Sequence, residues 1–474
     1  MWCSQSEPTS TSVLSMDNQS INQDHTQIIQ PLTISEPTLI KRPIYIDYNA
    51  TTPIDKHILN ELQYVSSTVY GNPSSSYSYG IQAKQLMDTS RQQCIHALNG
   101  TTDSIFIFTS CATESINIAI QGIIKQYNTT HKNSFPHIIT SSIEHVAVLN
   151  TVKYLTQHKY CTSTILPVNK YGCVDIDTLT NAIESNTILI SIILANNEIG
   201  TINNIQQLCH AAKQVNPNVL FHTDASQAMG KSPVDVQLLN IDLLSVAGHK
   251  VYTFKGIGGL YIKNNYVMKQ IQKLLHGAEH EYGVRAGTEN TLYSWSLGYG
   301  MNIAHQQLHD NIKHMNNMKQ LLYDTIISSI NSWIQHYTKQ QSPYITDVLY
   351  LHDNISYIKV NDNAVPLIHI NSSHFDTLCN TLSISFAYVN STELLSLIQH
   401  DICASAGSAC HSSTHTNTIS HVLHGIQLPD YYALGTLRLS TGKYNTDDEM
   451  NEAGKIIAQN VISLLIKQYC STSE

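Results

Sequence analysis

This sequence of 474 residues has no excess of positive charge. Lys and Arg number 26 against 35 Asp and Glu, so the formal net charge is -9 at pH 7. Because no basic stripe is available to neutralise phosphates, we do not expect nucleic acid as the main partner. Nor does any apolar run reach the roughly 18 residues that crossing a bilayer requires, so no membrane span is expected.

The cysteines also lack a pattern. The chain has 10 of them and none forms a CxxC pair, so the spacing indicates neither a zinc site nor a redox motif, and the density is too low for a disulfide scaffold. The N-terminus lacks the apolar core of a signal peptide. It also lacks the acid-poor composition of a transit peptide, because Glu7, Asp17 and Asp24 precede the first Arg, Arg42. We therefore expect a reduced, cytoplasmic protein without a bound metal.

The chain divides by composition into three parts. Residues 1–40 are rich in Ser, Thr, Gln and Asn and are predicted to be a disordered extension. Residues 43–305 alternate apolar strands with helices, which predicts an α/β domain with a mostly parallel sheet covered on both faces. The expected strands lie near residues 105–108, 137–140, 163–168, 187–194, 219–223, 242–247 and 258–262.

The last part, residues 306–474, is predicted to be a smaller α+β domain. It opens with a helix over about 308–330, whose apolar residues recur every three or four positions. A strand near 382–386 and a final amphipathic helix through Met450 and Leu464 follow. Residues 337–366 are expected to be irregular and to form an insertion.

Polar residues follow several strands of the first domain, where an α/β sheet binds its ligands. Cys111-Ala112-Thr113-Glu114-Ser115 opens a helix, and its free N–H groups with the Thr113 hydroxyl could seat a phosphate; the alternative is an ordinary helix cap. Glu144-His145 ends a strand. Its imidazole could stack on a flat aromatic cofactor, or it could be a hydrogen-bonded structural histidine.

Three further strand ends carry complementary groups. Asn196-Asn197-Glu198-Ile199-Gly200 could donate to a ring oxygen or simply begin a loop. Asp224-Ala225-Ser226-Gln227 could place a carboxylate against a pyridine nitrogen or cap a helix. In Gly248-His249-Lys250 a rigid, uncrowded lysine could form a Schiff base with pyridoxal phosphate, although many such runs are surface turns. Taken together, these groups predict one pyridoxal-phosphate site.

Two motifs of the second domain indicate the reaction. Ser405-Ala406-Gly407-Ser408-Ala409-Cys410-His411-Ser412 presents a thiol among small polar residues, which favours an exposed nucleophile over a buried apolar filler. Arg438 lies among apolar neighbours in an expected strand. It is predicted to pair with a carboxylate, and a bidentate grip on an amino-acid substrate would suit it.

These motifs, together with Asp47-Tyr48-Asn49-Ala50-Thr51-Thr52-Pro53, resemble those of the cysteine desulfurase and selenocysteine lyase family. The resemblance runs from about Pro43 to the last helix. It implies the type I fold of pyridoxal-phosphate-dependent transferases, which is the aspartate-aminotransferase-like fold. It also implies a homodimer, because Thr288 would reach the phosphate bound by the neighbouring subunit.

The resemblance further implies a role for each matching residue. Lys250 is the Schiff-base lysine and proton shuttle, Cys410 accepts sulfur or selenium, and Arg438 holds the substrate carboxylate. The remaining roles are ring stacking by His145, the pyridinium partner Asp224, ring-oxygen contacts from Asn197 and Gln227, and phosphate contacts from Ala112, Thr113 and His249.

Within the family, three features resemble a selenocysteine lyase, which releases selenide and L-alanine from L-selenocysteine: the loop Gly71-Asn72-Pro73-Ser74-Ser75-Ser76-Tyr77-Ser78, the short loop Cys410-His411-Ser412, and Ala247. The desulfurases usually carry a phosphate-binding Ser at the position of Ala247. Val146 points the other way, because animal lyases have an acid directly after the stacking histidine. The alternative is a cysteine desulfurase that passes persulfide sulfur to an acceptor protein. An aminotransferase of the same fold and a cofactor-free scaffold are rival interpretations.

Overall fold

A computed structural model describes most of the chain: residues 42–132, 134–339, 348–372, 376–406 and 419–469. The predicted extension over residues 1–40 and the predicted nucleophile Cys410 lie outside these residues. The first element of the described part is strand β1 (Ile44–Tyr45). Two helices that precede the main sheet follow, α1 (Lys56–Thr68) and α2 (Ser78–Ala97).

A seven-stranded sheet carries the first half of the fold, with strand order β2-β8-β7-β6-β5-β3-β4. Its strands are β2 (Ile105–Thr109), β3 (His137–Ser141), β4 (Thr162–Leu166), β5 (Thr187–Ser191), β6 (Leu220–Asp224), β7 (Leu243–Ala247) and β8 (Gly258–Ile262). The prediction of a mostly parallel sheet is confirmed, since only β8 pairs antiparallel with its neighbours. The short β7–β8 connection, which holds the 3₁₀ turn η1 (Gly248–Lys250), leaves no room for a parallel crossover.

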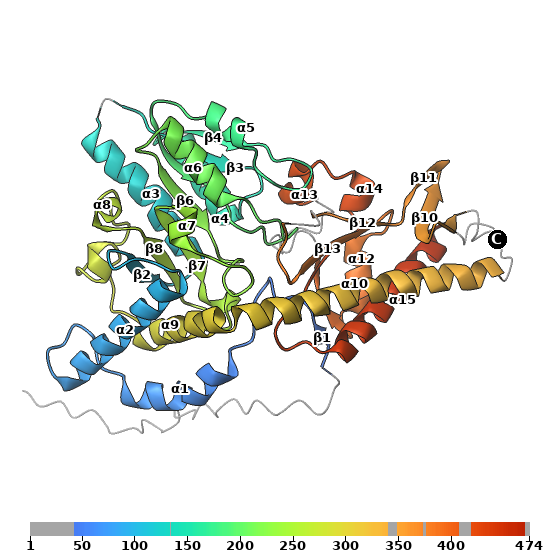
Figure 1. Cartoon of the computed structure of the whole chain (residues 1–474), viewed down its shortest axis with the longest axis horizontal. Helices are drawn as coiled ribbons and strands as arrows, with labels where there is room; N and C mark the ends of the chain where they lie inside the picture. The colour runs from blue at the N-terminus through green and yellow to red at the C-terminus, as the bar shows by residue number, and fades with distance from the viewer. Residues whose placement is uncertain (1–41, 133, 340–347, 373–375, 407–418, 470–474) are drawn as a thin grey trace, which may run out of the picture. The chain divides into compact units, whose positions relative to one another are not determined.

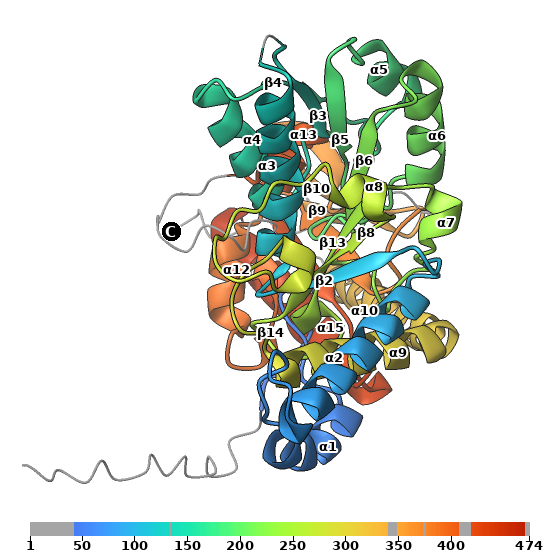
Figure 2. The ribbon, with the colours of Figure 1, turned by 90° about the vertical axis from the view of Figure 1, so that its left-hand side faces the viewer.

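Apart from the edge strand β4, whose residues are mostly exposed or half-buried, both faces of this sheet are buried, as its apolar strands require. On β2, Ile105 and Ile107 join a core with α3 (Ala112–Thr130) and α4 (Val146–Gln157). Phe106 and Phe108 point to the opposite core, formed with α2 and with the helices α5 (Ile176–Asn181), α6 (Ile205–Val215) and α9 (Thr291–Gln306). Figure 2 shows α3 and α4 on one side of the sheet and α5 and α6 on the other. The short elements α7 (Val236–Leu239), α8 (Asn265–Met268) and η2 (Glu281–Gly283) complete this half.

A second, four-stranded antiparallel sheet has the order β12-β13-β16-β15. Its strands are β12 (Ile368–Ile370), β13 (Thr381–Phe386), β15 (Ser405–Ala406) and β16 (Thr436–Ser440). The helices of this half are α10 (Leu308–Lys339), α12 (Ser391–Ile398), α13 (His421–Gly425), α14 (Asp430–Ala433) and α15 (Asp447–Tyr469). Helices α10 and α15 lie side by side (Figure 1) and share an apolar core with this sheet that includes Ile326, Ile384 and Ile457. The domain boundary expected near residue 305 falls between α9 and α10 and stays a prediction.

The expectation of an irregular segment over residues 337–366 is wrong. Helix α10 extends into it, and β9 (Leu349–His352), β10 (Ile355–Val360) and β11 (Asn363–Pro366) form an antiparallel sheet. Two-residue turns join the strands, Asp353-Asn354 and Asn361-Asp362, and all four residues have positive φ between 49° and 63°. Asn and Asp tolerate this conformation, which hairpin turns require, so these two pairs were a hairpin signal in the sequence.

Residues 44–50 lie between the two main sheets. Strand β1 pairs in parallel with β14 (Ile402–Cys403), and Asp47 bridges to Ser440 at the end of β16. This pairing brings residues 47–50 to the carboxyl ends of the seven-stranded sheet. No helix in the described part of the chain has the length and apolar character needed to cross a bilayer.

Candidate active site

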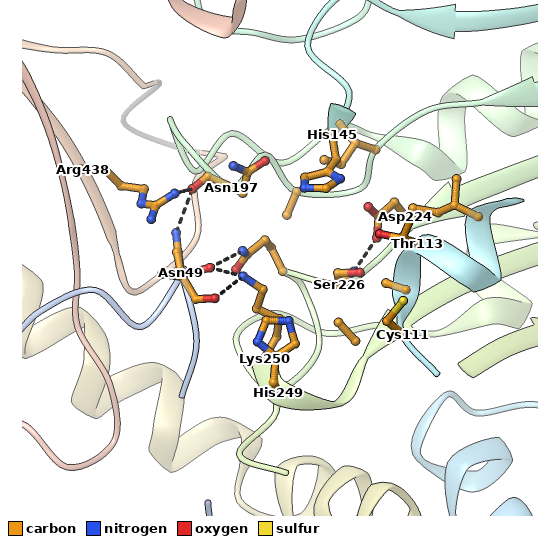
Figure 3. A pocket seen from close by; sticks show the side chains of 17 residues that line it. Asn49, Cys111, Thr113, His145, Asn197, Asp224, Ser226, His249, Lys250 and Arg438 are labelled. Carbon is orange, nitrogen blue, oxygen red and sulfur yellow. Dashed lines mark hydrogen bonds between the residues drawn. The ribbon is translucent and has the colours of Figure 1, made fainter. Parts of the chain in front are cut away.

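A cavity of about 320 Å³ opens where the strands β2, β3, β5, β6 and β7 end. It is lined by nine residues that the sequence predicts for the site: Ala112, Thr113, His145, Asn197, Asp224, Gln227, His249, Lys250 and Arg438. Figure 3 shows Arg438 at one end of this cavity and Thr113 with Cys111 at the other. Of the two other predicted site residues, Thr288 is exposed and does not line the cavity, and Cys410 lies outside the described residues. The role of Thr288 toward a neighbouring subunit stays a prediction.

The N-terminus of α3 forms one end of the cavity. Its cap residue, Cys111, makes no side-chain capping bond, so the first N–H groups of the helix keep their capacity for an anion. Close packing of β8 beneath them fixes their position. A Cβ atom on Gly258 would lie only 2.5 Å from the carbonyl carbon of Cys111 and 2.8 Å from the nitrogen of Ala112. The predicted phosphate seat therefore has the geometry that a bound anion needs.

The end of β6 supplies a buried carboxylate. Asp224 is 4% exposed, and its Oδ1 accepts the N–H of Ser226 at 2.9 Å. The next side chain that lines the cavity, Ser226, has a buried hydroxyl with no hydrogen-bond partner in the described protein. Behind Asp224, His222 bonds to Ser191 and Ser245, and burial lowers the pKa of His222 to about 4. His222 therefore stays neutral at neutral pH.

His145 lies across the cavity from Ser226 (Figure 3). The sequence predicts that His145 ends a strand, but β3 already stops at Ser141. His145 instead caps α4, and its Nδ1 accepts the N–H of Ala147 at 3.2 Å. Burial lowers the pKa of His145, and Asp224 only partly opposes this effect. A neutral imidazole of this kind suits stacking on an aromatic ring. The neighbouring Glu144 is fully buried, and burial raises its pKa to about 8.

Lys250 ends the 3₁₀ turn after β7 and extends its amine into the cavity. Its Nζ donates to the backbone oxygens of Asn49 and, at 2.8 Å, Ala50. His249 beside it bonds to Thr51 at 3.1 Å. Burial, with Lys250 and Lys255 nearby, lowers the pKa of His249 to about 4. The segment that contains Asn49 thus holds the predicted Schiff-base lysine in place through main-chain atoms.

Arg438 occupies the other end of the cavity and is 3% exposed. As the sequence predicts, it pairs with a carboxylate, and the partner is Asp47: Nη2 donates to Asp47 Oδ1 at 2.8 Å and to Ser405 Oγ at 3.1 Å. Nη1 donates to the backbone oxygen of Asn197 at 3.4 Å. The buried Nε has no partner in the described part of the chain. The guanidinium is therefore held on one side and has a donor left for another acceptor.

These groups fit pyridoxal phosphate. The uncapped N-terminus of α3 and the unpartnered hydroxyl of Ser226 can satisfy phosphate or ring oxygens, and the neutral His145 offers a flat surface for the ring. Lys250 supplies an amine and Asp224 a carboxylate. The volume lies within the range of small-molecule sites.

Four contributors were not predicted from the sequence: Asn49, Ser226, Glu144 and Lys231. The motifs around Asn49 and Ser226 were recognised, but their roles depend on a backbone oxygen and on an unpaired hydroxyl. Glu144 bonds to the N–H of Ile193 at 2.8 Å, and Lys231 Nζ bonds to Gln227 Oε1 at 2.7 Å. No pattern in the local sequence marks such buried contacts.

Comparison with known proteins places the chain in a family. The model of the family Aminotransferase class-V matches residues 44–353. The cysteine desulfurase IscS of Methanosarcina thermophila is 35% identical over 424 residues, which cover 89% of this chain and 93% of that protein. The probable mitochondrial cysteine desulfurase of Dictyostelium discoideum is 33% identical over 422 residues, which cover 89% and 83%.

Solved structures agree with this result. A NifS-like protein superposes with a TM-score of 0.74 at 30% identity, covering 89% of this chain and all of that chain. SspA in complex with cysteine gives a TM-score of 0.65 at 29% identity, covering 85% and 99%. The aspartate-aminotransferase-like fold and the cofactor expected from the sequence are both confirmed. The chain belongs to the class-V aminotransferase family of pyridoxal-phosphate enzymes, in the group that contains the cysteine desulfurases.

Proposed function

We propose that this protein is a cysteine desulfurase that transfers the sulfur of L-cysteine to Cys410. In this reaction the Cβ–S bond of cysteine breaks, the sulfur joins the Cys410 thiol as a persulfide, and L-alanine leaves. One observation carries the proposal: Lys250, Asp224, His145 and Arg438 line a single cavity. The chain is similar in sequence, over most of its length, to proteins named cysteine desulfurases.

The residues divide the work between binding and proton transfer. When bound, pyridoxal phosphate withdraws electrons from the α-carbon of an attached amino acid. The N-terminus of α3 would hold its phosphate, Asp224 would keep a proton on its ring nitrogen, and His145 would cover its ring. Lys250 would anchor the cofactor and then move a proton at the substrate α-carbon.

Arg438 would fix the substrate at the other end of the cavity. A guanidinium binds a carboxylate through a fork of N–H donors. Asp47 and Ser405 already occupy Nη2, and Nε is the buried donor that lacks a partner. The carboxylate of an amino acid at this point would place its amine toward Lys250.

Sulfur takes precedence over selenium in this proposal, which reverses the first preference drawn from the sequence. The relatives described above are named desulfurases, and their similarity to this chain covers most of their length. This outweighs the presence of Ala247 where desulfurases usually have Ser. That residue nevertheless keeps a selenocysteine lyase as the second candidate, because Ala247 lines the cavity without offering a hydroxyl. A homodimer, a sulfur acceptor protein and a cytoplasmic location accompany the proposal as predictions.

Parallel turnover of cysteine and selenocysteine by the purified full-length protein tests the function, with sulfide, selenide and alanine measured separately. We expect alanine and sulfide from cysteine in the presence of a thiol reductant, and loss of both in Cys410→Ala. Cys173→Ala is the control, because Cys173 is a partly buried cysteine that does not line the cavity. Selenide from selenocysteine without any product from cysteine would instead establish the lyase.

A further inference from the structure

A second lysine is buried beneath the cavity. Lys231 is 2% exposed, and its Nζ donates to Gln227 Oε1 at 2.7 Å and to Asn49 Oδ1 at 3.4 Å. Both partners are neutral amide oxygens. Burial lowers the pKa of Lys231 to about 7, with Lys250 and Arg438 lowering it further and Cys379 opposing them. Burying an amine costs free energy unless hydrogen bonds offset the loss of water.

Both partners of Lys231 line the cavity, and they also bond to each other. Gln227 Nε2 donates to the backbone oxygen of Asn49 at 2.9 Å, and that same oxygen accepts from Lys250. On the other side, Asn49 Oδ1 accepts from Asn380 at 3.0 Å, and its Nδ2 donates to Thr381 Oγ1 at 2.8 Å. Asn49 therefore links Lys231 to the predicted Schiff-base lysine, Lys250, by two hydrogen bonds.

In its ammonium form a lysine only donates hydrogen bonds, and a backbone oxygen only accepts them, whereas an amide group has one donor end and one acceptor end. The ammonium form of Lys231 on one side and the backbone oxygen of Asn49 on the other therefore permit only one orientation of Gln227. The reversed amide would turn its NH₂ toward the amine of Lys231 and its oxygen toward the oxygen of Asn49, and both contacts would be repulsive. The same argument fixes the Asn49 side chain, whose oxygen must face Lys231.

We propose that Lys231 is a positioning residue for the cofactor site, which holds the N–H end of Gln227 toward the cavity and keeps Asn49 in place to accept from Lys250. The inference rests on the proposed placement of the cofactor ring beside Gln227. It assigns a role to a group that touches neither the cofactor nor the substrate. A purely structural lysine would stabilise the fold without influencing how the cofactor is held.

Lys231→Met tests this role, because methionine fills the buried space without a donor. We expect the dissociation constant of pyridoxal phosphate to rise roughly tenfold, the effect of losing about one hydrogen bond. The visible absorbance band of the bound cofactor should lose amplitude to the near-ultraviolet, since the amide donor no longer faces the ring oxygen. Lys319→Met is the matched control: this partly buried lysine donates to the Leu378 oxygen at 3.1 Å and does not line the cavity.

Thermal unfolding of the cofactor-free proteins shows whether both variants are folded. If Lys231→Met does not fold, Lys231→Leu replaces it, with the same expectations, since leucine also lacks a donor. Wild-type affinity and an unchanged spectrum in the folded variant would overturn the inference. These readouts do not depend on sulfide release, so a wild-type protein that binds cofactor but fails to process cysteine would contradict the proposed function alone.

A double variant tests the route through Gln227. If Lys231 acts by orienting that amide, adding Lys231→Met to Gln227→Met should change the dissociation constant less than twofold, because the oriented group is already gone. Effects of the two single substitutions that multiply in the double variant would contradict this route.

Discussion

The two ends of the cavity differ in how their side chains are held. One end, which we name the cofactor end, is formed by Thr113, His145, Asp224 and Lys250. Asp224 is the last residue of β6, and each of the others closely follows a strand of the same sheet. The other end, the substrate end, is formed by Asn197 and Arg438, which come from separate elements. Asp47 and Ser405, which hold Arg438, come from two further elements. The bond between Asp47 and Arg438 joins residues 391 positions apart.

This difference agrees with the proposed function, in which one end holds a bound cofactor and the other an exchanging substrate. Backbone groups and neutral histidines fix the cofactor end, so its geometry is available before any ligand enters. The substrate end uses one ion pair between Arg438 and Asp47, with side-chain exposures of 4% and 14%. Nε has no partner among the described residues and Nη1 uses only one of its two N–H groups, so donors remain for a substrate that must bind and leave in every cycle.

The largest effect is expected at the cofactor end. Lys250→Ala removes the amine that would anchor the cofactor and transfer the proton, so kcat should fall by roughly 10⁴-fold or more. The yellow absorbance of the lysine-bound cofactor should disappear when the variant is mixed with pyridoxal phosphate. Lys255→Ala serves as the control, since Lys255 is near His249 without lining the cavity. Retention of the yellow band in Lys250→Ala would remove the central residue of this end.

A smaller and more selective effect is expected at the substrate end. Arg438→Lys keeps a positive charge beside Asp47 but loses the fork of donors, so the KM for cysteine should rise about tenfold or more. The dissociation constant of pyridoxal phosphate should stay unchanged, as measured by absorbance titration. Ser405→Ala is the matched control, because it removes another partner of the same guanidinium without altering the cavity lining. A loss of cofactor affinity in Arg438→Lys would mean that the two ends are not independent.

The same contrast separates what the sequence could predict from what it could not. Polar residues after apolar strands mark the cofactor end, because parallel strands bring their carboxyl ends to one edge. A carboxylate partner for Arg438 could be expected on physical grounds. Its identity as Asp47 could not, because the pairing depends on how β1 and β16 meet across the whole chain. Lys231 and Glu144 went unnoticed for a related reason: burial is a property of the folded chain.

The fold shows the same pattern. Alternating strands and helices predicted the seven-stranded sheet, whereas the reversed direction of β8 follows from the short connection after Lys250. The hairpins over residues 349–366 were missed although their turn residues were visible, since the flanking strands alternate only weakly between apolar and polar side chains. Strand β10 has the exposed Ile355 beside the buried Ser356.

The last effect concerns stability rather than catalysis and involves Glu144, which connects the two halves of the fold. Its carboxyl accepts the N–H of Ile193, and its backbone oxygen bonds to His421 at 2.9 Å. Burial raises the pKa of Glu144 from 4.5 to about 8, so the folded protein binds this proton more tightly than the unfolded chain. The stabilisation is complete below about pH 4.5 and is lost as the pH rises through about 8.

Glu144→Gln carries a neutral group at every pH and should escape this loss. Its free energy of unfolding relative to the wild type should therefore increase by up to about 1.4 kcal/mol per pH unit between those two pKa values. Urea denaturation of the cofactor-free proteins at several pH values measures the difference, with Glu279→Gln as a control at an exposed carboxylate. A difference that does not vary with pH would mean that Glu144 is ionised in the folded protein.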